Sequence, residues 1–513
     1  MLKRYDSLKT LFISINNVWR YGNIGMDQLT GYLRSKGFSI DIQYFSNKTL
    51  DSEIYSNIPF DYNVYGFSVN SSNYLKCCFL ANKIKEKNVN AIIVFGGGYP
   101  TRFYREVLSE NSAIDYVILG DGEKPMEALF DALIKKTKDF SHTSIATHND
   151  LKNKKDYLNK EILFLPAFDY YENDTAKRNS RKVHCIQTKN NVCTGNCSFC
   201  NERHGIISYK SIDKIIEEIK IVHTKFGVKK IFFTDDNILD PNDNTAKERL
   251  KTLCLNIEKL DFKIAFQCYI KANSLKDTEK DRELLHLMRK VGFIEIFVGL
   301  ESGNQHDLDL YNKHTTIEDN YRTMKLLKES NLIPIIGFIG FNPYTTLERI
   351  TENFKFLCNV ECTYLFNYIY SFVVINKYTT LYQKLLDDEL IEKNNTKYID
   401  IEYKFKNKNV SDILLYVKEQ MIPKLNDLDY QLDWVTYSFK EHKIWFDDIV
   451  DYTDTLTKYK QEDLIIIKKY LSILFIEHDL EKFKKVENLF WNHFKNREGQ
   501  LKNIYQYLIS LHK

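Results

Sequence analysis

The segment VHCIQTKNNVCTGNCSFCNERHG, residues 183–205, places three closely spaced cysteines directly after an apolar strand pattern. The strand pattern covers residues 183–190, and Cys193, Cys197 and Cys200 follow it in the spacing C-x-x-x-C-x-x-C. In a barrel of alternating strands and helices, the loop after a strand lies at the catalytic end. Three thiolates on such a loop can bind three irons of a cubane and leave the fourth iron without a protein ligand. The segment therefore predicts an iron–sulfur centre at the mouth of a barrel.

Zinc is the alternative metal for this loop. His204 lies four residues after Cys200, so a Cys₃His zinc site can be written down from the same segment. Small zinc-binding knuckles do not normally begin a long alternation of strands and helices, and such an alternation follows here. The context therefore favours iron–sulfur over zinc.

The alternation continues well beyond the cysteines. Apolar strand patterns recur at 229–237, 263–270, 294–302, 332–341 and 363–372, and helical patterns lie at 211–227, 283–292, 321–331 and 347–358. Six strands joined by crossover helices suit a partial (β/α)₆ barrel over residues 181–384.

The first 135 residues alternate in the same way, but their strand patterns end in small and polar residues. These ends read FSVNSSN (67–73), FGGGYPT (95–101) and ILGDGE (118–123). The order predicts a doubly wound, Rossmann-like sheet over residues 1–135, whose ligands bind outside the carboxyl ends of the strands. The polar stretch 136–180 is expected to be a linker.

Composition places the chain among globular α/β proteins with more than one domain. It has 513 residues, 43% of them hydrophobic, and a formal net charge of +3 from 72 basic and 69 acidic side chains. This near-neutral charge does not indicate a nucleic-acid partner. No window reads as a membrane span or a signal peptide, so we expect a cytoplasmic protein without a membrane partner. Residues 385–513 are expected to form a helical C-terminal domain.

The cysteine motif, with Phe199 as the aromatic residue before the third cysteine, resembles the signature of radical S-adenosylmethionine (SAM) enzymes. The resemblance implies a [4Fe–4S] cluster whose fourth iron is chelated by the amino and carboxylate groups of SAM. It also implies that Phe199 lies beside the adenine. Cleavage of SAM then yields a 5′-deoxyadenosyl radical, with the electron supplied by a donor such as flavodoxin or ferredoxin.

Two later segments extend the resemblance. GLESGNQHDLDLYNKHTT (299–316) and IGFIGFNPYTTLE (336–348) are similar to the fourth-strand and fifth-strand motifs of the branch that carries a cobalamin-binding domain. TDDN (234–237) follows the second strand, where family members place polar residues around SAM. The resemblance thus implies a SAM pocket with Asp235, Asp236 and Glu301. Any one of them could instead cap a helix or be a solvated carboxylate.

The N-terminal domain resembles the cobalamin-binding domain of the same branch. Small residues in its loops would let the backbone approach a bulky corrin and its nucleotide tail. The resemblance implies a cobalamin site with Ser68, Asn70, Gly96, Gly97, Gly98, Tyr99, Thr101, Gly120, Gly122 and Glu123. In the alternative interpretation, the glycines only shape the tight turns of an empty fold.

One departure concerns the lower ligand of cobalt. Many cobalamin proteins carry D-x-H-x-x-G after the first strand, whereas this chain reads NNVWRYGNIG (16–25) and has no histidine there. The resemblance therefore implies cobalamin without a histidine ligand, with Trp19, Arg20 or Tyr21 under the corrin. It also leaves open a domain that has lost cobalamin.

The architecture implies a cobalamin-dependent methyltransferase that methylates an unactivated carbon of a peptide or other small-molecule natural-product intermediate. One SAM molecule would be the methyl donor and a second the radical source. A single cluster is expected, because the N-terminal domain offers only the pair Cys77–Cys78 and no cysteine follows Cys362. The alternatives are a rearrangement or cyclisation enzyme, and a cobalamin-binding sensor with an inactive barrel.

Overall fold

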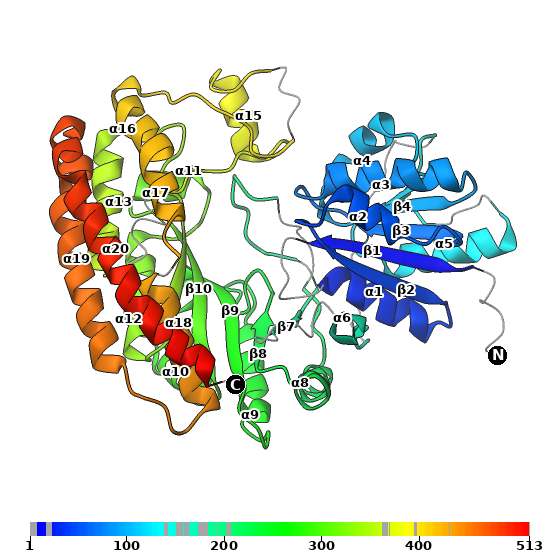
Figure 1. Cartoon of the computed structure of the whole chain (residues 1–513), viewed down its shortest axis with the longest axis horizontal. Helices are drawn as coiled ribbons and strands as arrows, with labels where there is room; N and C mark the ends of the chain where they lie inside the picture. Colours follow the sequence, from blue (N-terminus) through cyan, green and yellow to red (C-terminus); the bar gives the residue numbers. More distant parts are fainter. Residues whose placement is uncertain are drawn as a thin grey trace. The chain divides into compact units, whose positions relative to one another are not determined.

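The structure is a computed structural model of the chain (Figure 1). It describes residues 8–16, 23–137, 142–149, 157, 164–172, 183–190, 192–201, 207–361, 368, 370–393, 398–429 and 431–511. The chain divides into two compact units, Met1–Asn191 with Gly205–Asp235, and Val192–His204 with Asp236–Lys513.

The N-terminal sheet has the strand order β2-β1-β3-β4-β5-β6 among the described residues. Its strands are β1 (Thr10–Asn16), β2 (Ile40–Ser46), β3 (Val64–Ser68), β4 (Ile92–Gly96), β5 (Tyr116–Ile118) and β6 (Ile145–Ala146). Neighbouring strands pair in parallel except β5 with β6. The predicted doubly wound sheet is confirmed, and the antiparallel edge strand β6 lies within the polar stretch after it.

Helices flank this sheet (Figure 1): α1 (Ile24–Ser35), α2 (Asp51–Ser56), α3 (Tyr74–Lys87), α4 (Gly98–Glu110), α5 (Glu123–Lys135) and the short α6 (Asp169–Glu172). The polar stretch 136–180 contributes a segment that packs on α1. A side chain on Gly31 would place its Cβ 2.2 Å from the carbonyl oxygen of Leu165, so only glycine permits this approach. Arg34 then forms two hydrogen bonds with the Asp169 carboxylate, at 2.7 and 2.8 Å.

A second sheet has the strand order β11-β10-β9-β8-β7. Its strands are β7 (Val183–Ile186), β8 (Lys230–Phe233), β9 (Ala265–Lys271), β10 (Phe293–Glu301) and β11 (Ile333–Phe338). The pairs β7–β8, β9–β10 and β10–β11 are parallel, as the α/β class predicts. The sixth expected strand, 363–372, lies mostly outside the described residues, although Phe372 forms a parallel bridge with Phe341.

The helices that follow these strands begin and end at clear sequence signals. They are α8 (Ile212–Phe226), α9 (Ala246–Ile257), α10 (Glu279–Lys290), α11 (Gln305–Leu310), α12 (Ile317–Glu329) and α13 (Leu347–Asn359). Thr278 and Thr316 form capping boxes with Asp281 and Asp319 at the starts of α10 and α12. Helix α8 ends at Gly227, which has a left-handed φ of 65°.

The C-terminal region is helical, as expected. Its α-helices are α15 (Thr380–Asp387), α16 (Ser411–Tyr416), α17 (Ile422–Asn426), α18 (Leu432–Trp445), α19 (Thr453–Phe475) and α20 (Leu480–Ser510), with a π-helical turn at Val417–Met421. Helix α19 packs along α20 and against α13, while α18 contacts β10 (Figure 1). Within the part of the chain that the structure covers, none of the helices is both long and apolar enough to cross a bilayer.

Candidate functional site: the cysteine loop and the glycine loops

The cysteine loop, residues 192–201, follows β7 and is anchored near its start by a hydroxyl–carboxylate contact. The Thr194 hydroxyl donates to Asp240 Oδ1 at 2.5 Å. Asn242 Nδ2 donates to the Thr194 oxygen at 3.0 Å, so the same hydroxyl is held from two sides. Asp240 is buried, which makes this contact a rigid support for the loop.

The turn at residues 310–312 holds the rest of the loop. Asn312 Nδ2 donates to the carbonyl oxygen of Asn196 at 2.7 Å. The backbone N–H of Ser198 donates to the Tyr311 carbonyl at 2.8 Å, and the Ser198 hydroxyl donates to the Leu310 carbonyl at 2.7 Å. These bonds connect the three-cysteine motif to the 299–316 motif more than a hundred residues later.

Phe199 extends this contact into a hydrophobic cluster. Its ring meets the buried Tyr311 ring edge-on, with centroids 5.5 Å apart. The cluster also contains Ile339, Val373, Ile375, Leu381, Tyr382, Leu385, Leu390, Ile391 and Ile401. Residues beyond the fifth strand therefore help to hold the aromatic residue of the motif.

Sulfurs of the loop converge around Gly195. A Cβ atom at this position would lie 3.3 Å from Cys193 Sγ, 3.9 Å from Cys197 Sγ and 3.7 Å from Lys271 Nζ. The Gly195 N–H donates to Cys193 Sγ at 3.3 Å. Glycine thus leaves room for two thiolates and a cation on the same side of the loop.

Two buried lysines supply positive charge to the cysteines. Burial lowers the pKa of Lys271, and the nearby Lys313 cation lowers it further, while Cys197 and Cys193 oppose the shift. For Lys313, burial disfavours the charged form, but attraction to Glu301 and to Cys197 outweighs it and raises the pKa. Lys271 Nζ donates to the Lys313 carbonyl at 3.2 Å. The two lysines therefore place positive charge beside the sulfurs of the cysteine loop.

Glu301 ends β10 in a strained conformation. Its φ is 64°, which is uncommon for a residue other than glycine, and its carboxylate accepts from Lys313 Nζ at 2.6 Å. A Cβ on Gly299 would lie 2.8 Å from both Glu301 Oε1 and Lys313 Nζ. A side chain at Gly299, two positions before the glutamate, would therefore displace the ends of this ion pair.

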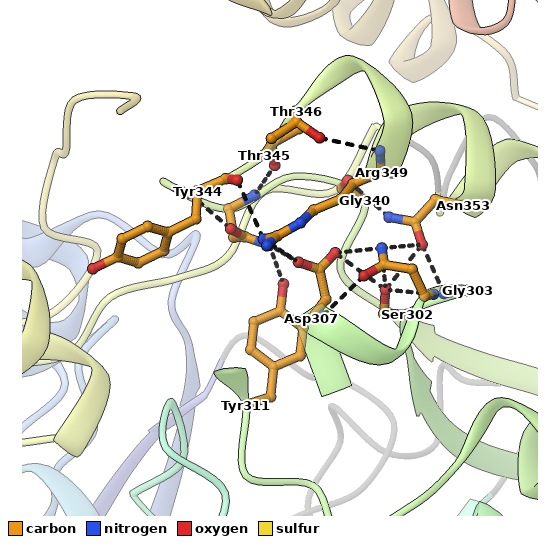
Figure 2. A network of polar contacts seen from close by, with 12 residues as sticks. Ser302, Gly303, Asp307, Tyr311, Gly340, Tyr344, Thr345, Thr346, Arg349 and Asn353 are labelled. Atoms are coloured by element: carbon orange, nitrogen blue, oxygen red, sulfur yellow. Dashed lines mark hydrogen bonds and ion pairs between the residues drawn. The ribbon is translucent and has the colours of Figure 1, made fainter. Parts of the chain in front are cut away.

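A buried polar network joins the 299–316 and 336–348 motifs (Figure 2). Asp307 lies at its centre and accepts from Asn304 Nδ2 at 2.8 Å, Asn342 Nδ2 at 2.9 Å and Arg349 Nη1 at 3.1 Å. Asn342 Nδ2 also donates to the Tyr311 hydroxyl at 2.9 Å. The network positions Tyr311, which in turn contacts Phe199 in the cysteine loop. The two motifs therefore support the cysteine loop through Tyr311.

The two aspartates after β8 differ in their surroundings. Asp235 is buried, and its oxygens accept from the Thr188 N–H at 2.8 Å, the Lys189 N–H at 3.0 Å and the Thr188 hydroxyl at 2.7 Å. Burial raises the pKa of Asp235, although these hydrogen bonds oppose the shift. Asp235 thus braces the segment that leads into the cysteine loop. Asp236 is half-buried.

Two sulfurs of the cysteine set lie near each other, because a Cβ on Gly195 would lie within 4 Å of both Cys193 Sγ and Cys197 Sγ, and cysteine sulfurs are the ligands of iron–sulfur clusters. No three His, Cys, Asp or Glu side chains among the described residues meet at the spacing of a single bound ion. His204, the fourth ligand of the alternative zinc site, lies outside the described residues.

The glycine loops of the N-terminal sheet form a close-packed edge with open space beside it. Gly97 has a φ of 108°, and a Cβ there would lie 2.6 Å from the Val69 carbonyl oxygen. A Cβ on Gly98 would meet nothing within 4 Å. The Thr101 hydroxyl accepts from the Gly120 N–H at 3.0 Å, which ties two of the loops together. Such an edge of small residues fits a bulky ring system.

Other residues predicted for cobalamin have local roles. Asn70 Oδ1 accepts from the Ser72 N–H at 2.9 Å and shapes its own loop. Tyr99 is buried against Tyr74, and burial raises the pKa of Tyr99 to about 12. A Cβ on Gly122 would lie 2.9 Å from Leu29.

The other residues predicted to bind cobalamin either lie at the ends of strands and helices or fall outside the described residues. Ser68 and Gly96 end β3 and β4, and Glu123 begins α5. Trp19, Arg20 and Tyr21 lie outside the described residues.

The sequence analysis did not identify the residues that surround the motif. Lys271 is the last residue of β9, and Lys313 lies inside the 299–316 segment. A lysine at the end of an apolar strand was the available signal for Lys271, since strand ends form the ligand-binding edge. No local signal marks the Thr194–Asp240 contact, because it joins residues 46 positions apart.

Two family models match the chain in the order that the motifs predict. The B12 binding domain matches residues 14–130, and the radical SAM superfamily matches residues 189–357. The chain therefore combines a cobalamin-binding domain with a radical SAM domain. It is a radical SAM enzyme of the kind that carries a B12-binding domain, and these domains imply a [4Fe–4S] cluster, SAM and cobalamin as its cofactors.

Curated relatives carry several activities in their names. An uncharacterized methyltransferase of Pyrococcus horikoshii is 24% identical over 67% of this chain and 74% of the relative. An anaerobic magnesium-protoporphyrin IX monomethyl ester cyclase of Rubrivivax gelatinosus is 25% identical over 64% of this chain and 60% of the relative. The 4'-phospho-dehydrooxetanocin synthase of Priestia megaterium is 24% identical over 73% of this chain. The chain covers 53% of that synthase, little more than half of its length.

Solved structures share the fold. The cobalamin-dependent SAM radical enzyme OxsB with aqua-cobalamin bound has a TM-score of 0.75 at 18% identity, covering 98% of this chain and 80% of that one. The radical SAM methyltransferase TsrM from Kitasatospora setae has a TM-score of 0.56 at 16% identity, covering 74% and 75% of the two chains. The longer coverage of OxsB includes most of the helical C-terminal region.

Proposed function

We propose that the chain is a cobalamin-dependent methyltransferase that methylates an unactivated carbon of a peptide or natural-product intermediate. One SAM molecule is the methyl donor and a second is the radical source. The observation that carries the proposal is the braced cysteine loop with two buried lysines beside its sulfurs. When bound, the cluster and SAM supply a radical and cobalamin supplies a methyl group.

The chain's own residues position these groups. Cys193, Cys197 and Cys200 are the proposed cluster ligands, and the anchors of their loop keep the sulfurs in place before metal arrives. Lys271 and Lys313 balance the negative charge of the thiolates and of a nearby carboxylate such as that of SAM.

We assign the SAM pocket to side chains around this loop. Phe199, held edge-on by Tyr311, offers a flat apolar surface to an adenine. Glu301 and Asp236 are the proposed polar contacts, while Asp235 acts through the backbone that it braces.

Cobalamin is assigned to the loops at the carboxyl ends of β3, β4 and β5. Gly96, Gly97 and Gly98 keep that edge free of side chains, and Gly98 faces open space. Ser68, Asn70, Thr101 and Gly120 are the proposed neighbours of the nucleotide tail. An electron donor such as flavodoxin or ferredoxin completes the reaction.

Ring formation or rearrangement is the second candidate. It is favoured by the relatives named cyclase and synthase. Methyl transfer is favoured by the methyltransferase names of the P. horikoshii relative and of TsrM.

The test begins with anaerobic purification and reconstitution with iron, sulfide and cobalamin. About four irons and one cobalt are expected per chain. The protein is then incubated with SAM and a reductant, with and without cobalamin, and S-adenosylhomocysteine and 5′-deoxyadenosine are measured. Methyl transfer predicts both products, with S-adenosylhomocysteine dependent on cobalamin.

Each alternative has a distinct result. 5′-Deoxyadenosine without any S-adenosylhomocysteine would exclude methyl transfer and leave the ring-forming candidate. Cobalt without iron would indicate the sensor, and zinc in place of iron would overturn both enzyme proposals.

A further inference from the structure

A basic cavity of about 350 Å³ lies in the second unit, away from the cysteine loop. It is bordered by the first residues of β11, Ile333 and Pro334, and by the helices α10, α12, α18 and α19. The glycine that faces Glu301, Gly337, lies near the other end of the same strand. The cavity is therefore separated from the candidate active site by most of the length of β11, roughly 15 Å at the usual rise per residue.

Positive charge dominates the lining. Five lining residues are basic and come from four helices, whereas two are acidic: the basic ones are Arg289, Lys328, Lys440, Lys443 and Lys460, and the acidic ones Glu361 and Asp433. Glu361 pairs with Lys328 at 3.2 Å. Lys443 pairs with Asp451 at 3.0 Å. In the part of the chain that the structure describes, Arg289, Lys440 and Lys460 form no ion pair.

The amine of Lys440 lies among these like charges. Its Nζ donates to Asn331 Oδ1 at 2.9 Å. Burial, together with repulsion from Arg289, Lys460 and Lys443, lowers the pKa of Lys440 to about 8. The protein thus holds several like charges around a half-buried amine, and the lining carboxylate of Glu361 is already paired with Lys328. An anion would relieve this arrangement.

We propose that this cavity binds a small organic phosphate. Cations that approach from several helices suit a multivalent anion with several acceptor oxygens better than a monovalent one. Apolar residues such as Met324, Leu332 and Phe439 line the remainder and suit the organic portion of the ligand.

The site would link parts of the fold that are distant in sequence. Arg289 and Lys328 belong to helices of the barrel, whereas Lys440 and Lys460 belong to helices of the C-terminal region. An anion between them attaches the C-terminal helices to the base of the barrel. Binding to the folded state alone then stabilises the chain.

The test uses the full-length, cluster-reconstituted protein and inorganic pyrophosphate as the probe. Calorimetric titration at constant ionic strength measures the dissociation constant for the wild type, Lys440→Gln and Lys460→Gln. The matched control is Lys458→Gln, which removes the same charge from an exposed position of α19 outside the cavity. Any effect of pyrophosphate on the cluster is common to all four proteins and cancels in the comparison.

Saturable binding is expected, weakened about tenfold in Lys440→Gln and Lys460→Gln and within twofold of wild type in Lys458→Gln. Circular dichroism confirms that each variant is folded. Absence of saturable binding, or equal affinity in all four proteins, overturns the site. Tighter binding of citrate than of pyrophosphate overturns the assignment to phosphate.

Discussion

Gly97 and Gly98 are neighbours in one loop, yet only Gly97 depends on being glycine. Its φ of 108° is a conformation that L side chains rarely adopt, and its Cβ would press on the Val69 carbonyl. Gly98 begins α4 with open space around it. A glycine run in the sequence thus contains one residue required by the backbone and another that leaves room at the loop edge.

Replacing each of these two glycines by alanine tests whether only Gly97 is required for the stability of the loop. Gly97→Ala is expected to destabilise the N-terminal unit by about 1–3 kcal/mol, through backbone strain and the close contact with Val69. Gly98→Ala is expected to change stability by less than about 0.5 kcal/mol. Urea unfolding of both variants measures the difference, and equal stability would contradict the geometry.

The positive charge of Lys271 is expected to raise the reduction potential of the cluster. Lys271→Met removes a cation beside Cys193 and Cys197, so the reduced, more negative cluster loses stabilisation. The reduction potential should fall by tens of millivolts, on the order of 1 kcal/mol. Spectroelectrochemical titration of the reconstituted cluster measures it. Lys280→Met, an exposed lysine of α10, is the control and should leave the potential unchanged.

At the scale of elements, loops from two strands form one supporting structure. Asp307 on α11 binds Asn342 and Arg349, which follow β11 (Figure 2). The 310–312 turn at the end of α11 then holds the cysteine loop. Three segments that are separate in sequence therefore act together to place three sulfurs.

Asp307→Ala tests this support. The change leaves Arg349 without its carboxylate and removes one of the two acceptors of Asn342 Nδ2, so destabilisation of about 3–5 kcal/mol is expected. The iron content of the Asp307→Ala variant after reconstitution should also fall below that of the wild type. Asp309→Ala, on the exposed side of the same helix, removes an equal charge and should retain both stability and iron. Unfolding curves and iron counts compare the pair, and full iron occupancy in Asp307→Ala would contradict the supporting role.

At the scale of the whole molecule, stability should depend on pH through the N-terminal unit. Burial raises the pKa of Asp27 to about 7, while hydrogen bonds from Tyr44 and Asn23 oppose the shift. The folded state then binds a proton that the unfolded state releases above pH ~4. This contribution is present at low pH and is lost as the pH rises toward 7.

Asp27→Asn removes this titration. Between pH 5 and pH 8, the wild type should lose about 2–4 kcal/mol relative to the variant. Thermal unfolding of both proteins at the two pH values gives the comparison. Parallel changes in wild type and variant would show that Asp27 ionises normally.

Local pattern in the sequence was enough for the classes of element and their order. Alternating strand and helix patterns predicted both sheets, and the threonine caps of α10 and α12 act through residues only three positions away. Helix α9 was not among the expected helices, although its buried residues Ala246, Leu250, Leu253, Cys254 and Ile257 recur at helical spacing. The cysteine motif predicted the cluster because its proposed ligands lie close together in the chain.

What the sequence alone determined is therefore what short-range physics controls: the α/β class, the two domains in order, the three cysteines and the loops with glycine. Tertiary structure decided which side chains surround them. Lys271, Lys313 and Asp240 reach the cysteine loop from other strands and loops, and the basic cavity collects its charges from four helices. These contacts depend on the distance between atoms in space, and burial strengthens each charge that they bring together. Neither quantity can be read from positions along a chain.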